Sequence, residues 1–400
     1  MSKKILFIAP SSYPVNSPEA IVNIKLLELL SNNGYEIDLI SKKIKWDNYP
    51  SSQTLDSLNV KIKRNIIVEV DNKLNIKTLF QHLLVYLIWG TVFKGAHWAY
   101  EVIFNNKSFF KDVKYDFVIT KDSPSLLIGY YLKKKYGLKW ISTWNDPYPS
   151  IKYPLPYGHG VNAMMPFYYK KIIKVMEFAD KHIFPNERLR DYMLNYINTS
   201  KEKSIIIPHL AYEQSLNEQK DIGTLKLVHA GNVRSPRNPK PIVEAFFRFL
   251  LEKGTVNDIT LDFIGIFDND LIKLVENSKY SRNINLLPPV EYKESLDLLK
   301  GYDVALIIEA PCEEGIFLPT KVGDYMSNNI PIFSISPQIG VLNDLYKQNY
   351  VQYFADINDI DGIFEELKKI HADYSNCKLK SSSFNEAYDK MNILDLYNKL

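Results

Sequence analysis

Short apolar runs alternate with longer segments of helical periodicity along most of the chain. The first forty residues show the pattern: a strand at KKILFIAP, an amphipathic helix that ends near Gly34, and a second strand at EIDLIS. Parallel strands need long crossover connections, which helices usually provide. The alternation therefore predicts an α/β fold with parallel sheets and helices on both faces.

Two such units are predicted. Residues 1–207 contain strands at ILFIAP, EIDLIS, FVIT, WISTW, HIFP and SIIIP. A polar, poorly periodic linker over Pro208–Gly223 precedes the strand LKLVHA, which begins a second unit over 208–382, and 383–400 is helical by pattern. Four hundred residues, 46% of them hydrophobic, are enough to bury two cores.

Residues 74–110 depart from this regularity. They are rich in aromatic residues, and Leu83–Phe93 is almost entirely apolar. This run is shorter than the roughly 20 residues that span a bilayer, so two interpretations remain. The segment is either a helical insertion that packs in the core of the first unit or an amphipathic hairpin at an anionic membrane surface. The second is supported by basic residues nearby, at Lys94, Lys107, Lys111, Lys114, Lys133–Lys135 and Lys170–Lys174.

The segment after LKLVHA carries the first candidate chemistry. Gly231 lets the chain turn close to a ligand, and a helix then begins near Pro239. The first turn of a helix leaves N–H groups unpaired and attracts anions. Arg237 lies at the mouth of this helix, where its guanidinium can bind phosphate oxygens. The alternative is an ordinary turn with an Arg that faces solvent.

A second segment, about ninety residues later, carries related groups. Lys321 and Asp324 are three residues apart and share one face of a predicted helix. A cation for phosphate and a carboxylate for ribose hydroxyls suit a nucleoside diphosphate. Taken alone, the pair could equally be a surface ion pair.

Both segments resemble motifs of retaining GT-B glycosyltransferases of family 4. GNVRSPRNPKPIVEA is similar to the family's phosphate loop, with Asn232 at the position of its Arg and Arg237 at that of its Lys. PTKVGDYMSNNIPIF is similar to a second signature, with Lys321 at its Lys and Asp324 at its ribose-binding Glu. The family's other acidic residue falls on Ile316, so Glu313 or Glu314 would have to replace it.

The resemblance implies a GT-B fold, with two Rossmann-like doubly wound domains that face each other across a cleft. It also implies that helix 383–400 packs back on the first domain. The expected reaction moves a sugar from a nucleotide-diphosphate sugar to a hydroxyl of a glycan or lipid-linked acceptor, with retention at the anomeric carbon. No metal or other cofactor is expected, because fixed cations stabilise the diphosphate.

The site residues expected from these motifs fall into three groups. The catalytic candidates are Asp146, Arg237 and Lys321. The donor-binding candidates are Gly231, Asn232, Arg237, Gly265, Glu314, Lys321 and Asp324. On the acceptor side we expect Ser17, in the turn after the first strand, and Asn145, beside Asp146 in an Asn-Asp-Pro-Tyr turn.

Charge and composition limit the classes of partner and the cellular compartment that we expect for this protein. A net charge of +3 gives no argument for nucleic acid. Cys312 and Cys377 have no metal-binding spacing and suit a reducing cytosol, and Met1–Pro10 lacks the apolar core of a signal peptide. We therefore expect a cytoplasmic protein, with the inner face of the membrane as a further possibility. Asp268-Asn269-Asp270 resembles a metal-binding Asp-x-Asp, but its place before a helix favours helix capping.

Two alternatives from other classes stay open. One is a nucleotide-sugar epimerase of the same architecture, which would need no acceptor. The other is a non-catalytic subunit that binds a nucleotide sugar or glycan, suggested by Asn232 and Ile316. The pathway expected from the resemblance is bacterial surface polysaccharide synthesis.

Overall fold

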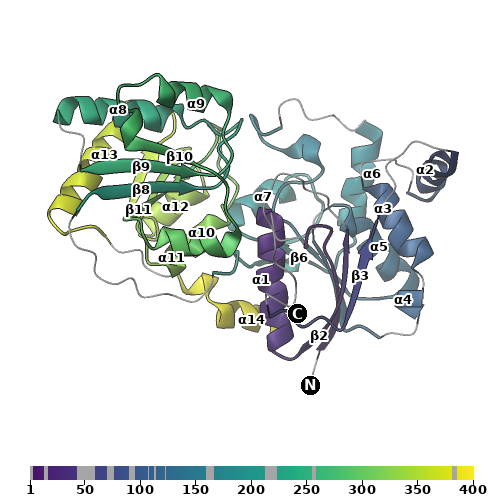
Figure 1. Ribbon diagram of the computed structural model, residues 1–400. Helices are drawn as coiled ribbons and strands as arrows, with labels where there is room; N and C mark the ends of the chain where they lie inside the picture. The colour runs from purple at the N-terminus through teal and green to yellow at the C-terminus, as the bar shows by residue number, and fades with distance from the viewer. Residues whose placement is uncertain are drawn as a thin grey trace. The chain divides into compact units, whose positions relative to one another are not determined.

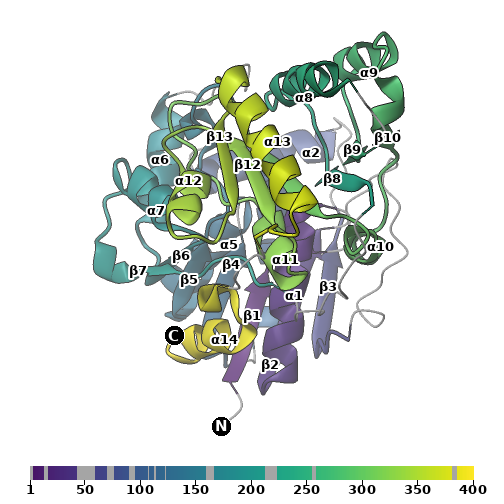
Figure 2. The same cartoon turned by 90° about the vertical axis from the view of Figure 1, so that its left-hand side faces the viewer.

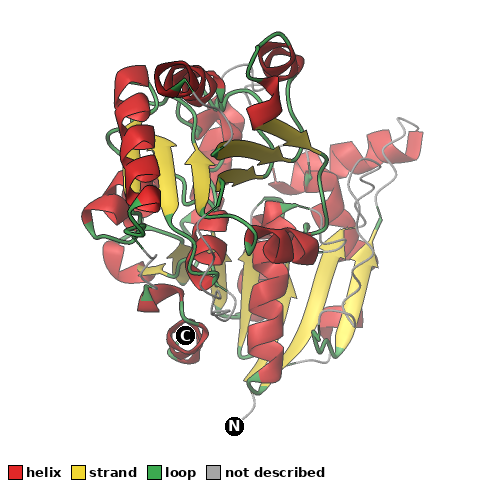
Figure 3. Cartoon of the chain, turned by 60° about the vertical axis from the view of Figure 1, so that its left-hand side comes forward, coloured by secondary structure: helices red, strands yellow, loops and turns green. Residues whose placement is uncertain are grey.

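Parallel strands build two separate sheets in the computed structural model, one in each of two units. The first unit comprises Met1–Tyr153, Gly160–Pro208 and Leu394–Leu400, and the second comprises Pro154–His159 and His209–Ile393. Figure 1 labels the elements, and Figure 3 shows strands and helices by colour. The structure describes residues 3–12, 17–42, 59–69, 76–89, 95–106, 108–111, 114–121, 123–158, 166–211, 223–254, 258–380 and 385–400.

The first sheet has the order β3-β2-β1-β4-β5-β6-β7, and all neighbours are parallel. The chain reverses its direction of growth between β1 and β4, as in a doubly wound sheet. The strands are β1 Lys3–Ile8, β2 Tyr35–Lys42, β3 Arg64–Val68, β4 Phe117–Lys121, β5 Trp140–Thr143, β6 Lys181–Phe184 and β7 Ser204–Ile206. The six strands predicted in this region are confirmed, and the edge strand β3 is an addition.

Helices cover this sheet. α1 contacts β2, α5 contacts β4 and β5, and α7 contacts β6 and β7. The α-helices are α1 Pro18–Asn32, α2 Ile76–Trp89, α3 Ala96–Tyr100, α4 Ser108–Lys111, α5 Ser125–Tyr136, α6 Pro166–Met176 and α7 Glu187–Leu194. The shorter turns are the π-helix η2 Glu101–Asn105 and the 3₁₀-helices η3 Ser150–Lys152 and η4 Lys201–Lys203.

The described part of the aromatic stretch 74–110 is helical apart from Gly95 and Asn106. Trp98, Val102 and Ile103 of α3 and η2 are buried, as expected of core helices. α2 instead exposes several large apolar side chains. Residues 74–75, 90–94 and 107 lie outside the described residues. α3 and η2 therefore contribute to the core of the first unit, whereas α2 is buried on one side only.

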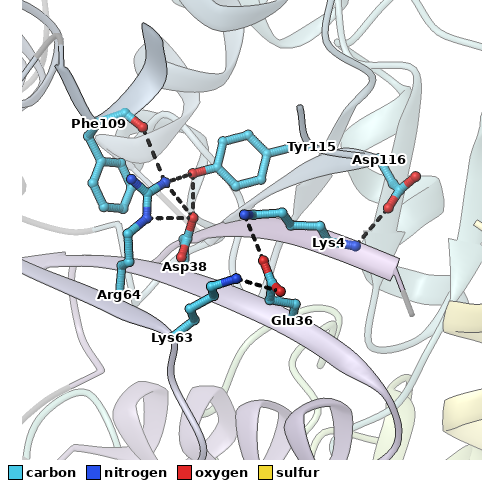
Figure 4. Close-up of polar contacts among 8 residues, drawn as sticks. All are labelled: Lys4, Glu36, Asp38, Lys63, Arg64, Phe109, Tyr115 and Asp116. Atoms are coloured by element: carbon cyan, nitrogen blue, oxygen red, sulfur yellow. Dashed lines mark hydrogen bonds and ion pairs between the residues drawn. The ribbon is translucent and has the colours of Figure 1, made fainter. Parts of the chain in front are cut away.

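A buried ion pair joins β2 to the edge strand β3. Asp38 is fully buried, and its Oδ2 accepts from Arg64 Nε at 3.0 Å, from Arg64 Nη2 at 2.6 Å and from the Tyr115 hydroxyl at 2.7 Å (Figure 4). The guanidinium also lies 4.1 Å from the centre of the Phe109 ring. A buried carboxylate needs such partners. Arg64 is the first residue of β3, so this cluster lies toward the amino ends of the strands and has a structural role.

The second sheet has the order β10-β9-β8-β11-β12-β13, again with parallel neighbours. The predicted strand LKLVHA is confirmed as β8. Residues 212–222 of the predicted linker before it lie outside the described residues. The strands are β8 Leu225–Ala230, β9 Ile259–Ile264, β10 Ile284–Leu287, β11 Val304–Ile308, β12 Ile332–Ser336 and β13 Tyr353–Asp356.

Two apolar layers hold helices on opposite faces of this sheet. Leu225 and Leu227 of β8 pack with α8, α9 and α13, whereas Val228 and Ala230 pack with α10, α11 and α12 (Figure 1). Figure 2 shows α13 beside β13, which it contacts. The helices are α8 Lys240–Lys253, α9 Asn269–Glu276, α10 Tyr292–Leu299, α11 Lys321–Ser327, α12 Val341–Lys347 and α13 Ile360–Ser375, with the 3₁₀-helix η5 Ser281–Asn283.

The chain ends in the first unit. A 3₁₀-helix, η6 Glu386–Tyr388, precedes α14 Lys390–Asn398. Lys3 Nζ donates to the Asn398 carbonyl at 2.7 Å, and the Tyr35 hydroxyl donates to Asn398 Oδ1 at 2.9 Å. The last residues of the chain therefore stabilise the unit that the first residues begin.

Candidate active site

The predicted donor residues gather where the second sheet changes direction. The chain builds β8, β9 and β10 outward and then returns to place β11 on the other side of β8. Ligands of doubly wound sheets bind at such a switch point, beyond the carboxyl ends of the strands. Here those ends carry Gly231 after β8, Gly265 after β9 and Glu309 after β11.

Gly231 and Gly265 adopt backbone angles that other residues rarely take. Their φ values are +133° and +150°. A Cβ on Gly265 would lie 2.6 Å from the Gly231 carbonyl oxygen, and a Cβ on Gly231 would lie 2.6 Å from Lys321 Nζ. Both glycines are therefore needed for the two loops and the Lys side chain to lie this close.

Lys321 is held by a histidine on β8. Lys321 is the first residue of α11, and its Nζ lies 3.1 Å from His229 Nε2. The other ring nitrogen of His229, Nδ1, lies 3.1 Å from the Leu306 carbonyl. A carbonyl can only accept, so we assign the proton to Nδ1, which leaves Nε2 to accept from the ammonium. His229 therefore fixes the position of Lys321.

Arg237 lies on the loop that enters α8 and pairs with a buried acid. Its Nη2 is 3.4 Å from Glu309 Oε1, and the Tyr157 hydroxyl donates to Glu309 Oε2 at 2.6 Å. The amide of Ala310 lies 3.3 Å from the same hydroxyl, and the Tyr157 and Phe317 rings meet edge to face at 4.7 Å. Glu309 thus positions the guanidinium.

The electrostatics of the site favour an anion. Burial and the nearby Arg237 guanidinium lower the pKa of Lys321 to about 7, while Glu309 opposes this shift. Burial also lowers the pKa of His229 well below its usual value, with Lys321 and Arg237 contributing. The Glu309 carboxylate raises the pKa of Arg237, which stays charged. Two clustered cations repel each other, and a bound anion would relieve that repulsion.

Asp324 lies one turn along α11 from Lys321. Its side chain is buried, and Oδ1 accepts from the Tyr292 hydroxyl at 2.9 Å. The Asp324 carbonyl accepts from Ser327 Oγ at 2.9 Å and from Asn328 Nδ2 at 2.8 Å. α11 therefore presents a positioned carboxylate and a cation together, although the prediction that Asp324 binds ribose stays a prediction.

Two side chains tie the loops after β8 and β9 together. Asn232 Oδ1 accepts from the Ile266 amide at 3.1 Å, and Asp268 Oδ2 accepts from the Ser235 amide at 2.9 Å. Asp268 occupies the N-cap position of α9, but its side chain makes no capping hydrogen bond there. The expectation that its side chain caps α9 was wrong, because the carboxylate accepts a hydrogen bond from the Ser235 amide, in the loop before Arg237, instead. Within the described residues, no three His, Cys, Asp or Glu side chains are grouped as a metal site.

The remaining predicted residues lie elsewhere. Glu314 lies in the loop from β11 to α11, beside Gly315, which bridges to Gly340. Ile316, in the same loop, is fully buried. Ser17 is the N-cap of α1 and accepts from the Ala20 amide at 3.2 Å. Asn145 and the exposed Asp146 follow β5 in the first unit, and their predicted roles stay predictions.

Glu309, Tyr157 and His229 were missed from the sequence. Glu309 had a signal, since it is an acidic residue directly after the apolar strand VALII. His229 interrupts another apolar strand. Tyr157 had none, because 152 residues separate it from Glu309 along the chain.

Solved structures with similar folds cover nearly the whole chain. Sucrose-phosphate synthase from Thermosynechococcus elongatus has a TM-score of 0.68 at 13% identity, over 99% of this chain and 98% of that one. The apo lipopolysaccharide outer core galactosyltransferase WaaB has a TM-score of 0.58 at 15% identity, over 99% and 100%. Anabaena HepE, in complex with UDP and glucose, has a TM-score of 0.64 at 10% identity, over 99% and 98%.

This likeness confirms the predicted fold class. The chain has the GT-B fold, with a Rossmann-like doubly wound sheet in each unit. No protein-family model matches it, and no curated protein matches it in sequence.

Proposed function

We propose that this protein is a glycosyltransferase that uses a nucleotide-diphosphate sugar. The observation that carries the proposal is the position of Lys321 and Arg237. Both belong to one charge cluster, with Lys321 against Gly231, at the switch point of the second sheet. A diphosphate offers charges that such cations bind, and the HepE structure with UDP and glucose supports a nucleotide-sugar donor on this fold.

The chemistry would be largely electrostatic. As the sugar–phosphate bond breaks, negative charge gathers on the diphosphate. Lys321 and Arg237 are held in advance by His229 and Glu309, so they can stabilise that charge without reorganising. Lys321 and Arg237 would then stabilise the diphosphate charge that a divalent ion stabilises in other enzymes. The proposal therefore includes no metal.

The other groups have supporting roles in the proposal. Asp324 would bind the ribose hydroxyls of the nucleotide, and Gly231 and Gly265 would let the backbone approach the phosphates. Asp146 would face the sugar or the acceptor, with Asn145 and Ser17 also on the acceptor side. The acceptor would be a hydroxyl of a glycan or lipid-linked glycan in bacterial surface polysaccharide synthesis, used with retention at the anomeric carbon.

The test is release of free nucleoside diphosphate from a panel of nucleotide sugars, with and without bacterial lipid extract. Arg237→Ala and Lys321→Ala should each reduce turnover at least about tenfold with little change in melting temperature, as expected when a charge-stabilising donor is lost. Matched controls are Arg248→Ala and Lys253→Ala, which remove exposed cations of α8 away from its N-terminus and should retain activity. Full activity in both site variants would exclude this site.

The same assay separates the alternatives. Conversion of the nucleotide sugar to an isomer without an acceptor would indicate an epimerase. Nucleotide binding without turnover would indicate a non-catalytic subunit. For an active transferase, NMR of the anomeric centre of the product would distinguish retention from inversion, in which Asp146 would act as general base.

A further inference from the structure

Helix α2 exposes most of its large apolar side chains and buries Val85 with the polar Thr78 and Gln81 on its opposite side. The outward side chains recur every three or four residues, so they form one face of the helix. Their exposed fractions are 88% for Ile76, 57% for Leu79, 60% for Phe80, 52% for Leu83, 40% for Tyr86 and 68% for Leu87. Scattered exposed apolar residues are normal, but a continuous face of six large ones indicates an interaction surface.

Polar contacts hold α2 in this orientation. Thr78 and Gln81 are buried on the opposite face. Gln81 donates to Glu101 of η2 and pairs with the His97 ring of α3. Because these side chains satisfy one another, the inward face of α2 is fixed by hydrogen bonds and the apolar face is left outside. Within the described residues, no helix is long and apolar enough to cross a membrane.

Aromatic rings and lysines continue from this region onto α5. α2 contacts α3, α3 contacts α5, and α5 contacts α6. Phe104 of η2 lies 5.9 Å from the Tyr131 ring of α5, and Lys135 Nζ lies 5.2 Å from the same ring. Lys134 Nζ lies 4.3 Å from the ring of Phe178, which is 40% exposed.

The charge on these helices has one sign. α2, α5 and α6 contain no Asp or Glu, while α5 carries Lys133–Lys135 and α6 carries Lys170, Lys171 and Lys174. Lys133 of α5 pairs with Asp180 at 2.5 Å. Lys134 and Lys135, on the same helix, lie beside aromatic rings instead. A partner must therefore offer both an apolar phase and negative charge.

We propose that the outward face of α2 docks on an anionic lipid bilayer, with the lysines of α5 and α6 on the lipid headgroups. The fourteen residues of α2 extend about 21 Å at 1.5 Å per residue, so the helix would lie along the surface rather than cross it. Interfacial helices combine these features: large apolar side chains on one face and nearby lysines. Docking on a bilayer would bring the protein to a lipid-linked acceptor, and only this purpose rests on the proposed function.

Flotation with vesicles tests the surface directly. The full-length protein is mixed with vesicles of phosphatidylcholine alone or of phosphatidylcholine with about one-third phosphatidylglycerol. We expect binding to the anionic vesicles only, weakened by salt. Phe80→Ser with Leu83→Ser should reduce the bound fraction about tenfold, as expected when buried apolar area is lost. Lys134→Gln with Lys135→Gln should weaken binding and flatten its salt dependence.

Two controls keep the result interpretable. Leu251→Ser removes a side chain of α8 that is 63% exposed in the second unit, and it should bind vesicles like the wild type. Nucleotide binding, measured without vesicles, should be unchanged in every variant, so a failure of docking is separate from a failure of the proposed function. Wild-type flotation by the Phe80/Leu83 variant would overturn the proposal. So would a wild-type dimer in solution that this variant converts to a monomer, because the face would then bind a second copy.

Discussion

Lys321 links the charge of the site to pH. Burial and the Arg237 guanidinium lower the pKa of Lys321 to about 7, so the ammonium of the free protein loses its proton as the pH rises above neutral. A bound diphosphate would raise this pKa, because the anion favours the charged form. Binding must then be accompanied by proton uptake above pH 7.

Affinity for a nucleoside diphosphate should therefore fall as the pH rises above about 7, by up to about tenfold per pH unit. Calorimetry across that range, in two buffers of different ionisation enthalpy, measures both the affinity and the protons taken up. Lys321→Arg keeps its charge at every pH and should flatten the dependence. A steep dependence in the Arg variant would contradict the assignment to Lys321.

Gly231 tests whether close packing at the switch point matters for binding. Gly231→Ala combines an unfavourable φ of +133° with a methyl group 2.6 Å from Lys321 Nζ. Gly34→Ala is the matched control, since Gly34 has φ +86° and no neighbour within 4 Å of the added methyl group. Each change should lower the free energy of unfolding by about 1 kcal/mol through backbone strain.

Only the Gly231 variant should also lose affinity for a nucleoside diphosphate, by at least about tenfold, because its methyl group displaces the ammonium. Thermal unfolding and calorimetry measure the two effects separately. Equal affinities in both variants would mean that Lys321 need not lie against the glycine.

At the scale of elements, hydrogen bonds join the two loops that follow β8 and β9. Asp268 holds the Ser235 amide two residues before Arg237, so its carboxylate supports the loop that carries a site cation. Asp268→Ala should raise the KM for the donor about threefold to tenfold by freeing this loop, as expected for one lost hydrogen bond to a charged group. Asp268→Asn keeps an acceptor oxygen and should stay near the wild type.

Steady-state kinetics on both variants distinguish this role from metal binding. A metal-binding Asp-x-Asp would lose activity with Asn as well as with Ala, because a neutral amide lacks the charge with which a carboxylate binds a divalent ion. Asp270→Ala is the control: Asp270 lies in the first turn of α9, is exposed, and should tolerate the change.

The elements themselves were largely predictable from the sequence. β1 contains the continuous apolar run Ile5–Ile8, and β8 is apolar apart from Lys226 and His229, which is close to the pattern of strands buried on both faces. β3 escaped prediction because Arg64 and Asn65 begin it and its side chains alternate between partly buried and exposed. An edge strand of this kind depends on its partner, here through the Asp38–Arg64 pair, which no local pattern reveals.

The site was predictable to the extent that its residues follow strands or open helices. Gly231, Arg237 and Lys321 were found in this way, and the structure brings them together. Periodicity does not show which distant side chains meet, so Tyr157 on Glu309 could not be inferred. Likewise, the sequence showed that 74–110 is apolar, but the outward orientation of α2 follows from Gln81 and its tertiary partners.

At the scale of the whole molecule, the chain passes from the second unit back to the first. Arg237, Lys321 and Asp324 belong to the second unit, whereas Leu394–Leu400 belongs to the first. Leu394 and Tyr397 are buried, and Asn398 bonds Lys3 and Tyr35. The two ends of the chain therefore stabilise the first unit, and the residues proposed to bind the nucleotide lie in the second.

Truncation after Ile393 should lower the stability of the first unit by several kcal/mol, roughly the cost of removing two buried side chains. Hydrogen exchange in β1, β2 and β5 would report the loss. Affinity for a nucleoside diphosphate should stay within about twofold, since the residues proposed to bind it lie in the second unit. Deletion of Lys399 and Leu400 alone keeps Tyr397 and Asn398 and should be much milder. Lost nucleotide affinity with unchanged exchange in the first sheet would contradict this division of roles.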